Sequence, residues 1–276
     1  MRYSKTAALV ALAALSAPVT AHSWIEQLRV IDSTGHYSSQ TGYPRAMADR
    51  KAPGFSDKQL VHILPPSDPL EARNVDFKVS TAGIKPSDAM CRRSQQELKQ
   101  TPNFPRLSAS PGSMIALRYQ ENGHVTLPQN SIRKPENRGN VYIYGTTNPK
   151  PTENFLDVFG KWNEQGTGGD KRGRLLAKQA YDDGQCYQVN GDKISLARQK
   201  QFPHKADPAM GMDLWCQNNF RIPQDLSSGK PYTIYWVWDW PTLPGSGPTP
   251  KGKCFPEFIL PFICLVSLPV SARLNC

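Results

Sequence analysis

His22 is the first residue whose place in the chain could give it metal chemistry. It follows a basic start, an apolar run over residues 7–14, and the small residues Val19 and Ala21, a pattern typical of a secretory signal. A cut after Ala21 would make His22 the first residue of the mature protein. A chain-terminal histidine offers an α-amine and a ring nitrogen, two ligands from one residue. We therefore expect residues 1–21 to be a signal peptide and His22 to chelate a metal ion.

A second histidine is needed to complete such a site, and the chain has five histidines. His124 follows an Asn-Gly turn, where a loop can present it at the end of a strand. His36 and His204 stand in polar loop segments, and His62 stands in an apolar one, so structural roles are favoured for these three. Three nitrogen ligands in a flat, T-shaped arrangement suit copper. The sequence therefore predicts a copper site made by His22 and His124.

The elements that must position these residues are short strands separated by turn signals. No regular alternation of strands and helices is present, and the 25 prolines and 20 glycines disfavour a helical bundle. We expect a mostly β fold, an antiparallel immunoglobulin-like or fibronectin-like sandwich with long loops and a few short helices. The expected strands are 22–33, 61–64, 113–119, 141–145 and 232–240, and one helix is expected within 191–220.

The strand over 232–240 carries a tryptophan at every second position. Trp236, Trp238 and Trp240 share one face with Ile234, and Asp239 lies on the other. A tryptophan stripe with this period is more often part of a core than a platform for sugars. We therefore expect Trp236 and Trp238 in the core, and Asp239 either at the surface or near the metal.

Charge and motifs exclude several classes of function. The formal net charge is +10, but the basic residues are scattered and form no aromatic-interleaved run, which disfavours a nucleic-acid partner. A hydrolase is also disfavoured, because no Gly-x-Ser-x-Gly motif is present and no spacing singles out an acid/base pair of carboxylates. A solvated basic surface on a secreted protein is the preferred interpretation.

Six cysteines are present, and a secreted chain is expected to form disulfides from them. None of the spacings is a CxxC zinc pattern, and six cysteines allow fifteen pairings. Cys91, Cys186 and Cys216 are the candidates within the main part of the chain, and their pairing stays open.

Three motifs in this order resemble the lytic polysaccharide monooxygenases. They are HSWIEQL at 22–28, ENGHVT at 121–126 and YTIYWVWDWP at 232–241. The chain is most similar to fungal secreted proteins of that general type that begin His-Ser-Trp. The likeness covers most of residues 22–244.

The resemblance implies a histidine brace, in which the α-amine and a ring nitrogen of His22 and a ring nitrogen of His124 hold copper. It implies a monomeric, extracellular enzyme that uses an external reductant to cleave chitin, cellulose or another β-linked cell-wall glycan oxidatively, with no nucleic-acid or membrane partner. The alternative is a secreted copper-binding or cell-wall protein that has the brace without the activity. The candidates for groups around the metal are Gln120, Glu121, Tyr235 and Asp239.

The end of the chain departs from this pattern. Related enzymes carry Glu-x-Tyr-x-x-Cys in a last strand, where the tyrosine is axial to copper, but no tyrosine follows Tyr235 here. The axial position is therefore either vacant or filled by Phe255, Phe258, Phe262 or Tyr235.

The tail over 251–276 changes abruptly in composition. Its apolar part is interrupted by three prolines and a glutamate, which makes it a poor membrane helix. Gly252-Lys253-Cys254 can be encoded by a sequence containing a splice donor, so we interpret the tail as a translated intron. The expected domain organisation is one copper-binding sandwich domain over 22–250, followed by an aberrant tail.

Overall fold

The structure is a computed structural model that describes most of the chain after the expected signal segment. The signal segment itself lies outside the described residues, as do Phe255, Phe258 and Phe262. The described residues are 22–64, 84–131, 134–241 and 263–269.

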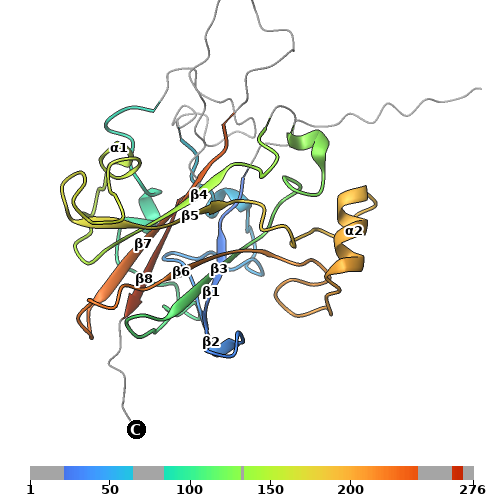
Figure 1. Cartoon of the computed structure of the whole chain (residues 1–276), viewed down its shortest axis with the longest axis horizontal. Coiled ribbons are helices and arrows are strands. Elements are labelled where there is room, and N and C mark those ends of the chain that lie inside the picture. The colour runs from blue at the N-terminus through green and yellow to red at the C-terminus, as the bar shows by residue number, and fades with distance from the viewer. Residues whose placement is uncertain (1–21, 65–83, 132–133, 242–262, 270–276) are drawn as a thin grey trace, which may run out of the picture.

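Eight strands form two four-stranded sheets in which every neighbouring pair is antiparallel (Figure 1). The protein is therefore a mostly β, antiparallel sandwich, as expected. The first sheet has the order β2 (Tyr37–Gly42), β1 (Ile25–Ile31), β3 (Met114–Tyr119) and β6 (Cys216–Arg221). The second has the order β5 (Gly173–Ala180), β4 (Asn140–Thr146), β7 (Pro231–Asp239) and β8 (Ile263–Pro269).

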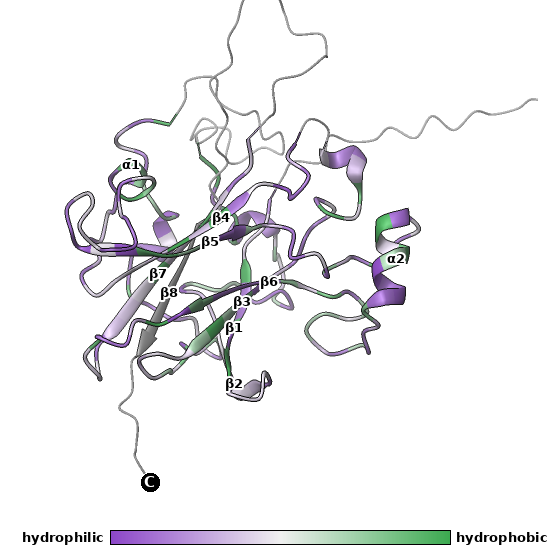
Figure 2. Ribbon diagram, viewed as in Figure 1, coloured by the Kyte–Doolittle hydropathy of each residue, from purple (hydrophilic) through white to green (hydrophobic). Residues whose placement is uncertain are grey.

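The helices of the described residues are short and lie in the loops. Asp192 caps the longest, α2 (Lys193–Gln201), by accepting a hydrogen bond from the backbone N–H of Ile194. Figure 2 shows α2 as a largely hydrophilic helix at the side of the sandwich. None of the helices in the described residues is long and apolar enough to cross a membrane. The others are α1 (Phe155–Val158) and the 3₁₀ helices η1 (Asp57–Gln59), η3 (Arg93–Gln95) and η4 (Pro128–Ser131).

Strand β7 is buried on both faces, which explains its unusual content of aromatic residues. Trp236 and Trp238 are fully buried in the core between the sheets, so the predicted core position of both is confirmed. On the opposite face, Tyr235 and Val237 belong to a second cluster, which the segment carrying α1 and Trp162 also joins. A strand covered on both sides has no polar face, so its alternation separates two apolar surroundings.

A bulge in β1 accounts for the imperfect alternation of that strand. Ile25 lies opposite Tyr119 and Gln27 opposite Arg118, so Glu26 is an extra residue in β1. Bulges of this kind turn one side chain away from the regular pleat and often lie beside functional sites. Here the bulge allows Ile25 and Glu26 to be buried in succession.

The short strand expected over 61–64 does not form, and this prediction was wrong. The segment follows η1, and the backbone N–H of Val61 bonds to the carbonyl of Asp57 instead of to a strand. Its apolar residues are explained by packing, because Leu64 is buried in the second cluster. A short apolar run cannot be identified as a strand by hydrophobicity alone.

Strand β8 lies inside the segment that the sequence analysis set apart as a tail. It pairs with β7 from Pro231 opposite Pro269 to Val237 opposite Ile263. The backbone of this segment therefore provides the edge strand of the second sheet beside β7.

Candidate metal centre

The pairing of β1 with β3 brings His22 and His124 together although 102 residues separate them. Antiparallel strands place the start of one beside the end of the other, and Ile25 lies opposite Tyr119. His22 directly precedes β1, and His124 lies in the turn that follows β3. The register of one strand pair is thus enough to juxtapose the two predicted ligands.

The nitrogen atoms of the two histidines face each other. The backbone nitrogen of His22 donates a hydrogen bond to Nε2 of His124 at 3.2 Å. Nε2 of His22 lies 3.5 Å from Oδ2 of Asp57, so the other ring nitrogen, Nδ1, is left on the side of the backbone nitrogen. Removal of residues 1–21 would convert that backbone nitrogen into an amine. His22 would then offer two adjacent nitrogen ligands next to one from His124.

The ring of His124 is fully buried in an aromatic cage. Its centroid lies 5.4 Å from the ring of Trp238 and 4.9 Å from that of Trp240, and Trp238 stacks on Tyr181. Burial, followed by the charge of His22, lowers the pKa of His124 to about 3. The imidazole is therefore neutral at physiological pH, which is the form that binds metals.

The turn that carries His124 is fixed by its own residues. His124 N–H bonds to the carbonyl of Glu121 at 2.9 Å, and Asn122 and Gly123 both have positive φ angles, 49° and 72°. A Cβ at Gly123 would lie 2.9 Å from Nδ2 of Asn130, so glycine is required there for space as well as for φ. Asn122 also donates to the carbonyl of His22 at 2.8 Å, which ties the turn directly to the other histidine.

Glu121 supports this turn from inside the protein. Its carboxylate is buried and accepts hydrogen bonds from the backbone N–H groups of Val125 at 2.7 Å and Gln188 at 3.3 Å, and from the Thr126 hydroxyl. The sequence analysis proposed Glu121 as a neighbour of the metal. Its hydrogen bonds instead make it a residue that holds the loop after His124.

A buried ion pair lies beside His22. Glu26, the bulge residue, is 3% exposed and forms an ion pair with Arg50, whose guanidinium lies 5.0 Å from the ring of Trp24. Gln120 donates to Glu26 at 3.1 Å, and Arg50 also reaches Asp57 at 3.9 Å. Burial raises the pKa of Glu26, although the hydrogen bond from Arg50 opposes this. The predicted neighbour Gln120 therefore belongs to this network.

The structure does not bring Tyr235 to the histidines. It lies on the opposite face of β7 from Trp236 and Trp238 and packs in the second cluster, because successive strand residues point to opposite sides of a sheet. Asp239 is half-buried and approaches the centre indirectly. Its charge acts on Lys134, whose ammonium donates to the carbonyl of Trp240 at 3.0 Å.

Three groups beside the histidines were not anticipated from the sequence: Asp57, Arg50 and the indole rings of Trp238 and Trp240. Asp57 and Arg50 lie in a loop-rich stretch with no motif, and their position depends on how the loop folds back on β1. For Glu26, a signal was present, because a charged residue interrupts an otherwise apolar first strand. The tryptophans were assigned to the core, which is correct, but they also form the wall around His124.

Cys186 and Cys216 form a disulfide, and both are buried in the main core. The carboxylate of Asp183 lies close to them, but it accepts hydrogen bonds from the backbone N–H groups of Gln185, Cys186 and Gln217. Disulfide-bonded sulfurs are not thiolate ligands, so this group is a structural element and not a second metal site. Cys91 is buried in the second cluster.

Comparisons with known proteins give one family and one solved structure. The structure is titled "X-Ray photoreduction of Polysaccharide monooxygenase CBM33"; it is 12% identical to this chain, with a TM-score of 0.26. The match covers 62% of this chain and 64% of that one, less than two thirds of either. No curated protein matches the chain. The family model described as "Domain of unknown function (DUF7492)" matches residues 19–254, and the chain therefore belongs to this family.

Proposed function

We propose that this protein is a secreted copper protein of the lytic polysaccharide monooxygenase type, which holds its metal with His22 and His124. The observation that carries the proposal is the 3.2 Å approach of the His22 backbone nitrogen to Nε2 of His124. Two nitrogens on His22 and one on His124 are a donor set that suits copper in both of its common oxidation states. When bound, copper supplies one-electron chemistry with dioxygen or peroxide.

The protein's own residues would prepare this centre. The cage of Trp238 and Trp240 excludes water from the His124 ring and keeps it neutral, so that Nε2 can act as a ligand without first losing a proton. Asp57 lies beside Nε2 of His22, where a proton on that nitrogen directs the lone pair to Nδ1. Asn122, bonded to the carbonyl of His22, holds the backbone that carries the amine.

A second candidate function is copper binding without oxidative cleavage. The observation that favours it is the position of the tryptophan stripe: Trp236, Trp238 and Trp240 are buried and cannot serve as a platform for a glycan. In that case the same histidines would capture copper at the cell surface. Both functions predict copper binding, and only the first predicts oxidised sugars.

The test uses two forms of the protein that differ by one residue. The mature form begins at His22, and the control retains Ala21, which turns the α-amine into an amide. We expect the mature form to bind one Cu(II) and the control to bind at least about 100-fold more weakly, by calorimetry and electron paramagnetic resonance. Equal affinities would reject the proposed centre. Oxidised oligosaccharides released from chitin or cellulose with ascorbate, and only by the copper-loaded mature form, separate the first function from the second.

A further inference from the structure

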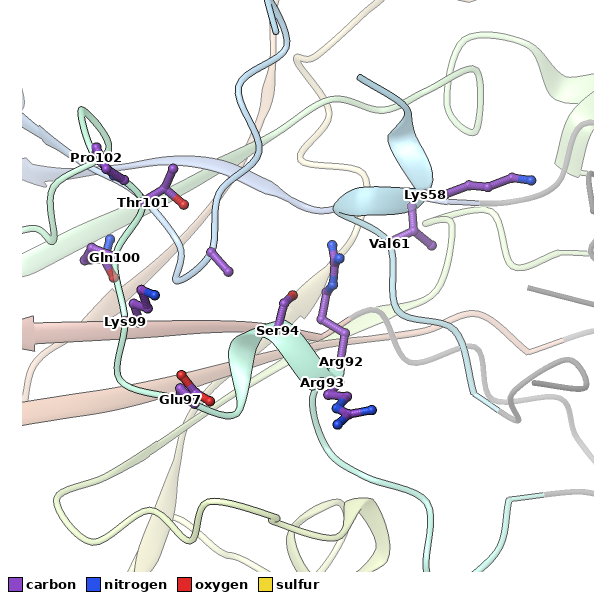
Figure 3. A pocket seen from close by; sticks show the side chains of 11 residues that line it. Lys58, Val61, Arg92, Arg93, Ser94, Glu97, Lys99, Gln100, Thr101 and Pro102 are labelled. Carbon is purple, nitrogen blue, oxygen red and sulfur yellow. The ribbon is translucent and has the colours of Figure 1, made fainter. Parts of the chain in front are cut away.

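A basic pocket of about 840 Å³ lies between η1, η3 and the loop that follows η3 (Figure 3). Four cationic side chains line it, and Glu97 is the one acidic residue among its lining residues. Its volume falls within the range of sites that hold small organic ligands. The four cations are Lys58, Arg92, Arg93 and Lys99.

Three of these cations make no ion pair with any residue that the structure describes: Arg92, Arg93 and Lys99. Elsewhere in the described chain, arginines of similar or lower exposure, such as Arg172 and Arg198, are paired with carboxylates. A cluster of cations without matching carboxylates repels itself and attracts anions. The charge of this pocket is therefore not explained by packing within the described protein.

Arg92 is the innermost of the four. It is half-buried, and its Nη1 is buried without a hydrogen-bond partner in the part of the chain that the structure describes. In Figure 3, its side chain points from η3 toward the segment that carries Lys58 and Val61, whereas Arg93 points away from that segment. Burial lowers the pKa of Arg92, which indicates that its charge is partly deprived of water. An anionic group against the exposed part of the guanidinium would offset this loss.

The buried Arg45 adds a further positive charge beneath the pocket. Its guanidinium donates to the carbonyl of Gln95 at 3.3 Å and to the Thr233 hydroxyl at 2.7 Å, both of which are uncharged acceptors. Gln95 belongs to η3, which also carries Arg93. The side chain of Gln100 is already occupied, because it donates to the carbonyl of Phe104 at 2.8 Å. The hydroxyls of Ser94 and Thr101 are the uncharged polar groups left for a ligand.

We propose that this pocket is a binding site for an acidic oligosaccharide, one whose sugars carry carboxylates. Several cations spread across a pocket of this size match a ligand with more than one negative group, and guanidinium groups bind carboxylates through paired hydrogen bonds. The hydroxyls of Ser94 and Thr101 match the hydroxyls of a sugar, and no aromatic residue among the lining residues offers a stacking surface. Recognition would thus depend on charge. This site does not require copper or the histidine pair.

The pocket also adjoins the candidate metal centre along the chain. Lys58 is in η1 directly after Asp57, whose carboxylate lies 3.5 Å from Nε2 of His22. A carboxylate-bearing chain held in the pocket would therefore be anchored on the same loop that supports His22.

The experiment measures binding of a galacturonic acid hexamer to the full-length mature protein by calorimetry at low salt. We expect binding that weakens as salt rises, no binding of the uncharged hexamer cellohexaose, and an affinity about tenfold lower in Arg92→Gln. The matched control is Lys205→Gln, which removes one exposed positive charge outside the pocket and should change the affinity less than twofold. Absence of binding in the wild type, or equal loss in both variants, would overturn the proposal.

Two further arms guard against misinterpretation. Ser94→Glu places a carboxylate at an exposed pocket residue without removing a buried group, and it should weaken binding even if Arg92→Gln fails to fold. Inorganic phosphate is the competitor: displacement of the hexamer at equal concentration would identify a site for small anions and overturn the assignment to a glycan. His124→Ala should bind the hexamer normally, so failure of the copper proposal would leave this result unchanged.

Discussion

Two buried polar regions of this protein differ in how completely their groups are satisfied. At one side of the second sheet, Arg172 bonds to Glu153 at 2.5 Å and Asp170 at 2.7 Å, and Asp170 also accepts from Trp162 at 3.0 Å. At the histidine pair, His124 is fully buried, its Nε2 accepts only from His22 at 3.2 Å, and its Nδ1 has no partner among the described residues.

The pKa shifts of the two regions express the same difference. Burial raises the pKa of Asp170, but the hydrogen bonds from Arg172 and Trp162 outweigh it and lower the pKa to about 2. Burial lowers the pKa of His124 to about 3, and the hydrogen bond from His22 does not compensate. A satisfied network stabilises a fold, whereas a buried, neutral and underused imidazole is prepared for a ligand that the chain itself does not provide.

The largest effect is expected when the underused group is removed. His124→Ala in the mature protein should lower Cu(II) affinity by at least about 1,000-fold, because one of three nitrogen ligands is lost. Calorimetric titration with copper measures this. His36→Ala is the control, since His36 lies in an exposed turn beside Asp32 and Thr34, and its copper affinity should match that of the unaltered protein.

Breaking the satisfied region should affect stability alone. Arg172→Ala leaves the nearly inaccessible carboxylate of Glu153 without its cation, and we expect the free energy of unfolding to fall by about 3 kcal/mol. Urea denaturation of the metal-free protein measures this change. The copper affinity of the folded variant should stay unchanged, and a parallel loss of copper binding would contradict the separation of the two regions.

The buried imidazole should also make stability depend on pH. The pKa of His124 lies near 3 in the folded protein and near 6.5 when unfolded, so the unfolded chain binds more protons between these values. The stabilisation is fully present above pH 6.5 and is lost as the pH falls toward 3, by up to about 1.4 kcal/mol per pH unit. His62, whose pKa is also lowered by burial, acts in the same direction.

The histidine variants separate these two contributions. Urea unfolding of the metal-free protein between pH 7 and 4 should show a shallower slope for His124→Gln than for the unaltered chain. His36→Gln, at an exposed site, should keep the original slope. An unchanged slope in His124→Gln would show that the ring is not held neutral.

The smallest effect concerns the orientation of His22. Asp57→Asn keeps the size of the side chain but removes its negative charge, and we expect copper affinity to fall about tenfold. This lies at the low end for a group that supports a metal ligand, because Asp57 is 47% exposed and its charge is screened by water. Asp32→Asn, beside His36, is the matched control and should leave copper binding unchanged.

Local patterns predicted much of the fold. Alternation over Tyr232–Trp240 predicted a strand with its tryptophans in the core, and the structure confirms both. The Asn-Gly turn before His124 was also evident, because few residues accept the positive φ angles that it needs. The error over Val61–Leu64 arose because an apolar run reports burial and not hydrogen-bond pairing.

Other features of the candidate site depended on contacts between distant segments. The chain around Asp57 and Arg50 has no periodicity, and its return to β1 is set by packing of Trp24, Met47 and Leu60 in a small third cluster. Likewise, the disulfide between Cys186 and Cys216 could not be selected from fifteen pairings, since sequence spacing says little about which loops meet.

The sequence by itself determined the residue types that can do chemistry here: a histidine after an expected signal cut, a second histidine after a rigid turn, and a strand that alternates between two apolar faces. Each depends on neighbours along the chain, where backbone geometry acts directly. Only the tertiary structure decided that Nε2 of His124 lies 3.2 Å from the His22 nitrogen, that Tyr235 faces away, and that unpaired cations gather beside η3. Strand register and loop packing fix these relations, and both result from contacts between segments that are far apart in the chain.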